Sequence, residues 1–173
     1  MKRSTGRRLR SWRCCGASAL FDLQEELDSV RRAFEAGGIE YALCGGLAMA
    51  VHGFPRATID IDVLIQPADL ERAYTAAERL GYTFRGKPMS FDKGAMEIRR
   101  ITKIDPKDGE ALMLDLLLVT HASEQVWETR QKTNWRGADL WVVSPQGLIT
   151  LKSGRASHID LADIEHLRGE NER

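Results

Sequence analysis

The chain of 173 residues has the length of one ordinary domain, and its 43% hydrophobic and 29% charged residues exclude a collagen-like or wholly disordered protein. The formal net charge is zero, but the first fifteen residues carry six positive charges and no negative one, so the remainder is acidic. No stretch reaches the roughly 18 apolar residues of a membrane-spanning helix, and Asp115 interrupts the richest one, Ala111 to Val119. We therefore expect no membrane partner.

The N-terminal segment is basic and has few hydrophobic side chains. We expect residues 1–20 to be a disordered extension and residues 21–173 to form a single domain. Such an extension is suited to binding nucleic acid or anionic lipid, while an upstream extension or a misassigned start explains it equally well. No apolar stretch of a secretory signal follows it, and the three cysteines lack disulfide or zinc-site spacing. A cytoplasmic location is the expectation.

Hydrophobic spacing and turn residues divide the rest of the chain into helices and strands. In chain order, the patterns predict a helix over 21–36, a strand over 39–44, a short helix over 47–52, a strand over 58–65, a helix over 67–80, strands over 82–84, 95–104 and 112–119, a helix over 123–132, a strand over 139–143, and two final helices that begin near Ser144 and Ser157. This order predicts an α/β (α+β) fold, a mixed twisted sheet with packed helices.

Capping residues predict where the two C-terminal helices begin. Ser144 before Pro145 is a hydroxyl cap followed by proline in the first turn, and Ser157 with Asp160 is a capping box. Acidic residues favour the first turn of a helix, so we expect Asp163 to stabilise a helix start.

Two carboxylates share one face of the strand over 58–65. Because side chains alternate along a strand, Asp60 and Asp62 point the same way about 7 Å apart, which allows both to bind a hard divalent ion. A solvated face of an edge strand is the alternative interpretation.

Asp115 lies in a run whose other members are all apolar, a pattern typical of a central strand. An ionised carboxylate buried without a partner costs several kcal/mol, so a compensating cation is required. A metal ion shared with Asp60 and Asp62 would compensate it if the two strands are neighbours. An ion pair with an arginine and an exposed edge position are the alternatives.

Gly45 and Gly46 lie at the turn from a strand into a helix. Paired glycines there let the backbone approach a phosphate group closely, although a tight turn alone explains them as well. A triphosphate carries roughly four negative charges and can lie beside three carboxylates only when divalent metal bridges them. A phosphate site and an acidic site in this chain would therefore depend on each other.

The segment from Tyr41 to Ile65, with Gly45-Gly46 followed by Asp60-x-Asp62, resembles the signature of the polymerase β nucleotidyltransferase superfamily. It is most similar to small bacterial proteins related to the AbiEii toxin and to minimal nucleotidyltransferases. The resemblance covers roughly residues 39–167 and implies a nucleotidyltransferase-like core plus C-terminal helices. It also implies Mg-dependent transfer of a nucleoside monophosphate from a nucleoside triphosphate to an acceptor hydroxyl, with release of pyrophosphate.

The resemblance further implies roles for individual residues. Asp60, Asp62 and Asp115 match the catalytic carboxylates, which hold two Mg²⁺ ions, with Mn²⁺ as an alternative, and Asp115 would also activate the acceptor hydroxyl. The implied nucleotide-binding residues are Gly45, Gly46, Arg56 and Lys152.

The two cationic residues of that set have alternative interpretations. Arg56 is suited to a phosphate group, and equally to an aspartate that holds the turn. Lys152 and Asp160 resemble a lysine and an aspartate of the family's C-terminal helices. The ammonium group of Lys152 shares a helix face with Leu148, so it must snorkel or point into a cleft, and we expect the cleft.

The expected partners are a nucleoside triphosphate, an acceptor that is RNA, protein or a small molecule, and a cognate partner protein. The alternative function is a non-catalytic nucleotide- or partner-binding member of a toxin–antitoxin-like pair. Arg99, Arg100 and Lys103 form a basic stretch that is either a solvated strand face or a phosphate contact.

Overall fold

The computed structural model describes residues 22–106, 109–155 and 157–170; the predictions for residues 1–20 lie outside these ranges. Its helices (α), 3-10 helices (η) and strands (β) are α1 (Leu23–Ala36), β1 (Tyr41–Cys44), α2 (Gly45–Val51), β2 (Asp60–Ile65), η1 (Pro67–Asp69), α3 (Leu70–Glu78), β3 (Phe84–Arg85), β4 (Met89–Phe91), η2 (Asp92–Gly94), β5 (Met96–Ile104), β6 (Ala111–Leu118), η3 (His121–Ser123), α4 (Glu124–Glu128), β7 (Gln131–Trp135), β8 (Ala138–Val142), α5 (Pro145–Arg155) and α6 (His158–Glu170).

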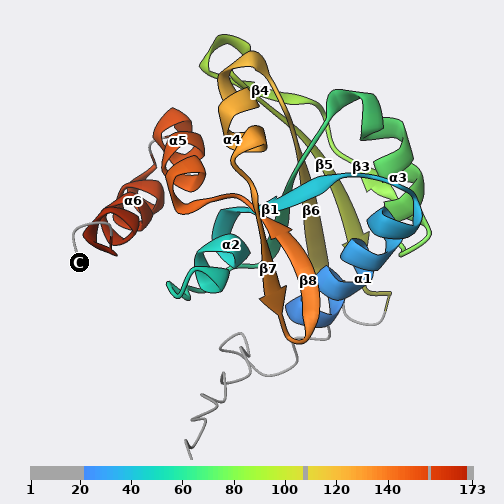
Figure 1. The fold of residues 1–173 in the computed structure, drawn as a ribbon. Coiled ribbons are helices and arrows are strands. Elements are labelled where there is room, and N and C mark those ends of the chain that lie inside the picture. The colour runs from blue at the N-terminus through green and yellow to red at the C-terminus, as the bar shows by residue number, and fades with distance from the viewer. Residues whose placement is uncertain (1–21, 107–108, 156, 171–173) are drawn as a thin grey trace, which may run out of the picture.

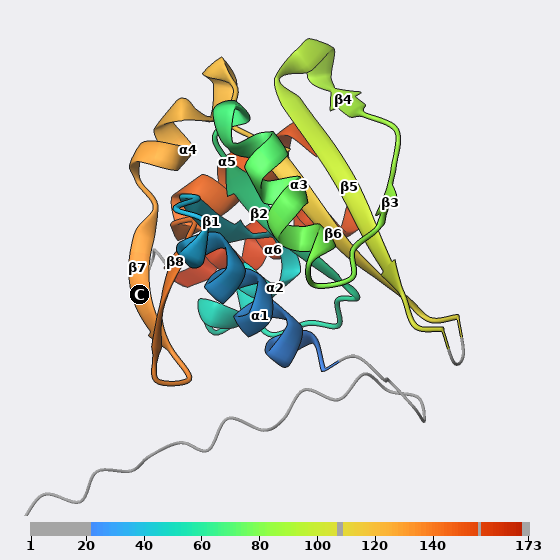
Figure 2. The same ribbon diagram turned by 90° about the vertical axis from the view of Figure 1, so that its right-hand side faces the viewer.

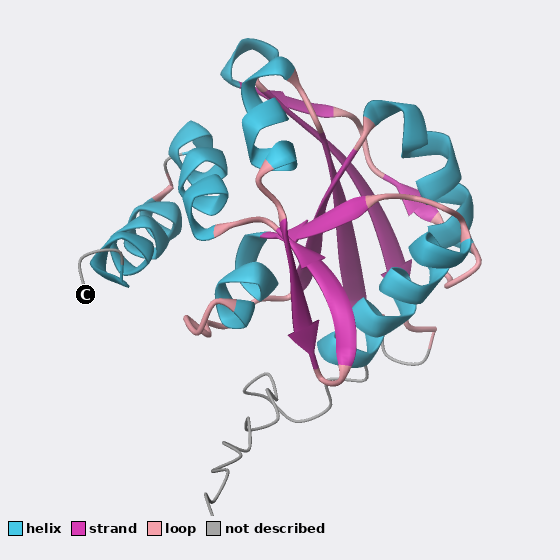
Figure 3. Ribbon diagram, in the orientation of Figure 1, coloured by secondary structure: helices cyan, strands magenta, loops and turns pink. Residues whose placement is uncertain are grey.

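The strands of the described residues form one mixed sheet of eight strands in the order β3-β5-β6-β2-β1-β8-β7, with β4 also pairing with β5. The pairs β2–β6 and β1–β8 are parallel, and the other pairs are antiparallel. The sheet is twisted and has helices on both sides, so the predicted fold class is confirmed (Figures 1 and 3).

The helices divide between the two faces of the sheet. α1 and α3 lie side by side on one face, and α2, α5 and α6 lie on the other (Figure 2). The ring of Phe34 in α1 meets the ring of Tyr41 in β1 edge-on, 6.1 Å between centroids, which anchors α1 to its face. Ile61 and Val63 of β2 point to this same face and are fully buried.

The starts of the last two helices follow the predicted caps. Ser144 accepts a hydrogen bond from the backbone N–H of Gly147 at the start of α5. The side chains and backbone N–H groups of Ser157 and Asp160 bond each other reciprocally at the start of α6. Both N-terminal signals are therefore confirmed.

The helix predicted over 123–132 is wrong in its second half. α4 ends at Glu128, and Gln131–Trp135 forms the strand β7, which pairs with β8. Arg136 and Gly137 connect the two strands with positive φ angles of 53° and 85°, as a two-residue hairpin turn requires. This turn decides the structure of a polar segment that has little strand signal of its own.

The edge of the sheet at β3 and β4 also differs from the prediction. The strand expected over 82–84 forms at Phe84–Arg85, and Tyr82 lies in the core with 0% exposure. The short strand β4 was not predicted, and it forms by pairing with the first residues of β5. No helix in the described part of the chain is long and apolar enough to cross a bilayer.

Candidate active site

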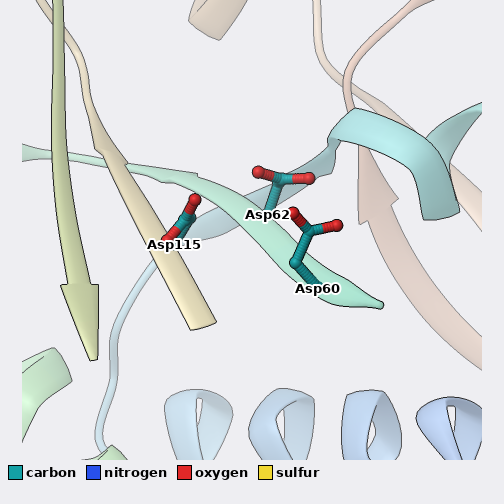
Figure 4. A group of neighbouring side chains, drawn as sticks. All are labelled: Asp60, Asp62 and Asp115. Atoms are coloured by element: carbon teal, nitrogen blue, oxygen red, sulfur yellow. The ribbon is translucent and has the colours of Figure 1, made fainter. Parts of the chain in front are cut away.

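Three aspartates converge where β2 and β6 run side by side. The two strands are parallel neighbours, and their register places Asp62 beside Asp115. Asp60 lies two residues earlier on the same face, and the three carboxylates each offer an oxygen within 4.8 Å of the others. Their side chains point toward one another on the side of the sheet away from α1 (Figure 4). We call these residues the acidic triad.

The acidic triad lies largely out of solvent. Asp62 is 7% exposed and Asp115 is 2% exposed, while Asp60 is half-buried. Carboxylate oxygens are the ligands preferred by hard divalent cations such as Mg²⁺, and like charges this close need a cation between them. The donor set therefore fits a divalent metal ion.

Arg100 is a cation already present at the acidic triad. It lies opposite Asp115 in the register of β5 and β6, and its Nε and Nη2 donate to the two Asp115 carboxylate oxygens, each at 2.7 Å. This hydrogen bond raises the pKa of Arg100, and the charges of Asp115, Asp60 and Asp62 raise it further against the effect of burial. The arginine pair that stood as an alternative to a metal is thus part of the same cluster.

Gly45 is required where the backbone passes Asp62. Its φ is +64°, and a Cβ added there would lie 1.8 Å from Asp62 Oδ2. A Cβ on Gly46 would lie 2.8 Å from both Cβ and Oγ1 of Thr58. Thr58 Oγ1 in turn donates to Asp60 Oδ1 at 2.6 Å. The two glycines therefore let the start of α2 pack directly on the residues that hold the acidic triad.

Arg56 and Lys152 belong to a second cluster of charges, formed by α5, α6 and the loop before β2. We call Arg56, Lys152, Asp160 and Asp163 the C-terminal ion cluster. Lys152 Nζ lies 2.7 Å from Asp163 Oδ2 and 3.4 Å from Asp160 Oδ1, and Arg56 Nε donates to Asp163 Oδ2 at 3.0 Å. Lys152 and both aspartates are buried. The ammonium group of Lys152 does not point into an open cleft, because two carboxylates of α6 surround it.

The structure corrects the role expected for Asp163. This residue is well inside α6, which begins at His158, so it does not stabilise the helix start. It instead accepts hydrogen bonds from Lys152 and Arg56. Its spacing of three residues from Asp160 places both carboxylates on one helix face, a signal that the sequence contained.

Arg56 connects the two clusters. A Cβ on Gly46 would lie 3.3 Å from Arg56 Cζ, so the guanidinium packs against the glycine turn beside the acidic triad. The alternative in which Arg56 pairs with an aspartate is observed. Thr58 was not predicted, although it lies only two residues before Asp60, a spacing that the sequence contained. The pairing of Arg100 with Asp115 was not predicted because it depends on which strands lie next to each other.

No protein-family model and no curated protein matches the chain. Solved structures do match it. A candidate nucleotidyltransferase from Thermotoga maritima, TM1012, has a TM-score of 0.52 at 14% identity, over 88% of this chain and 94% of that one. The solution structure of the antibiotic-resistance factor ANT(2″)-Ia has a TM-score of 0.53 at 16% identity, over 82% of this chain and 78% of that one.

A crystal structure of ANT(2″)-Ia in complex with adenylyl-2″-tobramycin has a TM-score of 0.51 at 9% identity, over 87% of this chain and 99% of that one. At such identities the likeness shows the fold alone. The chain thus has the fold of these nucleotidyltransferases, whereas the relationship to AbiEii-type proteins stays a prediction.

Proposed function

We propose that this protein is a metal-dependent nucleotidyltransferase. It transfers a nucleoside monophosphate from a nucleoside triphosphate to an acceptor hydroxyl and releases pyrophosphate. The observation that carries this proposal is the acidic triad, whose three carboxylates offer oxygens within 4.8 Å of one another. The triad adjoins a glycine turn, in a fold that solved nucleotidyltransferases share.

Asp60, Asp62 and Asp115 would hold Mg²⁺, or Mn²⁺ in its place. When bound, the metal supplies positive charge that neutralises the triphosphate and favours departure of pyrophosphate. Three carboxylates this close together repel a triphosphate, so positive charge from a bound metal would favour its binding.

The chain's own residues have separable roles in this proposal. Thr58 holds Asp60 in place through its 2.6 Å hydrogen bond. Gly45 and Gly46 bring backbone close to the triad, where it would contact phosphate. Arg56 lies over this turn and would meet the phosphates with its remaining N–H groups. Asp115 would accept the proton of the acceptor hydroxyl.

In this proposal Lys152 acts indirectly, through its ion pair with Asp163. It is buried against Asp163, which also bonds Arg56, so it would influence nucleotide binding by holding Arg56 over the glycine turn. The acceptor is an aminoglycoside-like small molecule, an RNA end or a protein hydroxyl, and these three classes are the ones to assay.

Nucleotide binding is tested by thermal unfolding with each nucleoside triphosphate, with and without Mg²⁺. When the free ligand is present at about 100 times its Kd, binding to the folded state raises the free energy of unfolding by about 2.7 kcal/mol. We expect a raised midpoint that requires both Mg²⁺ and Asp62. The matched control is Asp139→Asn, because Asp139 pairs with Lys132 at an exposed site on β8.

Catalysis is tested by transfer of an α-labelled nucleotide to each acceptor class. Asp60→Asn and Asp62→Asn should abolish transfer and leave the fold intact, whereas Asp139→Asn should retain it. Full activity in either triad variant contradicts the proposal. Tight binding of a partner protein together with no nucleotide shift would favour the non-catalytic, toxin–antitoxin-like alternative.

A further inference from the structure

Arg100 and a metal ion would compete for the same carboxylate. Both oxygens of Asp115 accept hydrogen bonds from the Arg100 guanidinium at 2.7 Å, yet Asp115 also belongs to the set of carboxylates that converge as metal ligands. The Asp115 side chain is 3% exposed and that of Arg100 is 36% exposed. The guanidinium thus covers the buried carboxylate from the solvent side.

The charges make this competition substantial. A divalent ion at the triad and the guanidinium would be separated by a few ångströms, and even in the dielectric of water their repulsion changes binding by on the order of tenfold. Without a cation, in contrast, Asp115 would be a buried and uncompensated carboxylate. The same arginine therefore stabilises the metal-free site and opposes metal binding.

We infer that Arg100 is a built-in counter-ion that holds the acidic triad together before metal binds and lowers the affinity of the site for free divalent cations. This inference rests on the metal-binding role proposed for the triad. A triphosphate brings negative charge that offsets Arg100. The site therefore favours a metal that arrives with nucleotide over a free ion.

Arg99 provides a matched control for this inference. It is the adjacent residue of β5, so its side chain leaves the opposite face of the strand. There it pairs with Glu97 at 2.7 Å. Replacing Arg99 removes the same charge from the same strand without touching Asp115.

The test is a titration of the full-length protein with Mn²⁺ and no nucleotide, in which electron paramagnetic resonance measures free Mn²⁺. Arg100→Gln should bind Mn²⁺ about tenfold more tightly than wild type, whereas Arg99→Gln should bind as wild type does. Arg100→Lys retains the charge and should stay close to wild type. Equal or weaker binding by Arg100→Gln overturns the inference.

Thermal unfolding provides a second measurement. With a chelator present, Arg100→Gln should unfold at a lower temperature than Arg99→Gln, and Mn²⁺ should raise its midpoint by more than it raises that of wild type. A lower midpoint that Mn²⁺ does not restore would assign Arg100 a purely structural role and overturn the inference.

The outcomes separate this inference from the proposed reaction. If neither wild type nor Arg100→Gln binds Mn²⁺, both the metal site and the counter-ion role are rejected. If Arg100→Gln binds Mn²⁺ more tightly but wild type transfers nucleotide to no acceptor, the counter-ion role holds and the proposed reaction fails.

Discussion

The two aspartate clusters of this protein differ in their balance of charge. The C-terminal ion cluster matches two carboxylates with two cations, and Asp163 is shared between Lys152 and Arg56. In the acidic triad, three carboxylates converge, and the pair between Asp115 and Arg100 is part of the cluster. Because its charges balance, the C-terminal ion cluster needs no further ion and serves to hold α5, α6 and the loop before β2 together. The acidic triad carries an excess of negative charge, so a bound cation would stabilise it.

The largest expected effect breaks the balanced cluster. Lys152→Ala leaves two buried carboxylates with Arg56 as their remaining partner in the cluster, and loss of one member of a buried pair costs about 3–5 kcal/mol. Denaturant unfolding measures this loss. The control is Lys132→Ala, which removes an exposed pair with Asp139 and should cost about 0–1 kcal/mol. Equal losses in the two variants would show that Lys152 is not a clamp.

The next effect is expected at the glycine turn beside the acidic triad. Gly45→Ala should lower the free energy of unfolding by at least about 1–2 kcal/mol, the cost of a left-handed conformation for a residue with a Cβ. It should also remove the stabilisation by Mg²⁺ and nucleotide, because the Cβ would displace Asp62.

Gly38→Ala separates these two contributions. Gly38 has a φ of +62°, and Arg72 Nη1, at 3.9 Å, is the atom nearest to its added Cβ. Gly38→Ala should lower the free energy of unfolding by a similar amount and should still be stabilised by Mg²⁺ and nucleotide. If both variants keep that response, contact between Gly45 and Asp62 does not matter for binding.

A smaller effect, of opposite sign, is expected within the triad itself. Asp60→Asn removes one of three like charges and keeps an acceptor for Thr58, so it should stabilise the metal-free protein by up to about 1 kcal/mol. The same change at Asp163 should destabilise the protein, since that carboxylate faces two cations. Urea unfolding in the presence of a chelator compares the two variants. If both changes shift the free energy of unfolding in the same direction, the two clusters do not differ in charge balance.

The smallest effect at neutral pH is expected at Tyr82, whose titration matters only at alkaline pH. Burial raises the pKa of Tyr82 far above its usual value, and the charge of Glu26 raises it further. A tyrosine whose folded pKa is raised contributes stability that is fully present below pH 10 and is lost as pH rises further. The slope is up to about 1.4 kcal/mol per pH unit.

Tyr82→Phe should therefore change stability little at pH 7, where its hydrogen bond to Glu26 is long at 3.5 Å, and should flatten the alkaline decline. Unfolding at pH 7 and pH 11 checks this. An unchanged slope would mean that Tyr82 is not the group that titrates, and Tyr41, whose pKa burial also raises, would be the next to test.

Local patterns predicted the elements whose signals lie within a few residues. The Ser144 cap and the Ser157–Asp160 box depend on hydrogen bonds between near neighbours, and both were found. Gln131–Trp135 was misassigned because its strand depends on a partner across the Arg136–Gly137 turn. A polar segment of this kind takes its structure from the neighbour with which it pairs.

For the candidate site, too, the sequence predicted the local features but not the contacts between distant segments. The alternation around Asp60 and Asp62 indicated that both carboxylates share a face, and the apolar run around Asp115 indicated burial. The pairing of Arg100 with Asp115 was beyond reach, because it requires that residues fifteen positions apart meet in one antiparallel register. Lys152 was expected to point into a cleft, and its partner Asp163 was expected to stabilise a helix start, whereas the two form an ion pair.

The sequence by itself determined the helices and strands whose periodicity and capping signals are local, and which side of each is polar, because these properties follow from short-range spacing. Only the tertiary structure decided that β2 and β6 are parallel neighbours, which brings Asp62 beside Asp115. Strand order depends on how segments far apart in the chain pack together. Periodicity within a single strand does not encode its neighbours, so the acidic triad exists only at the level of the sheet.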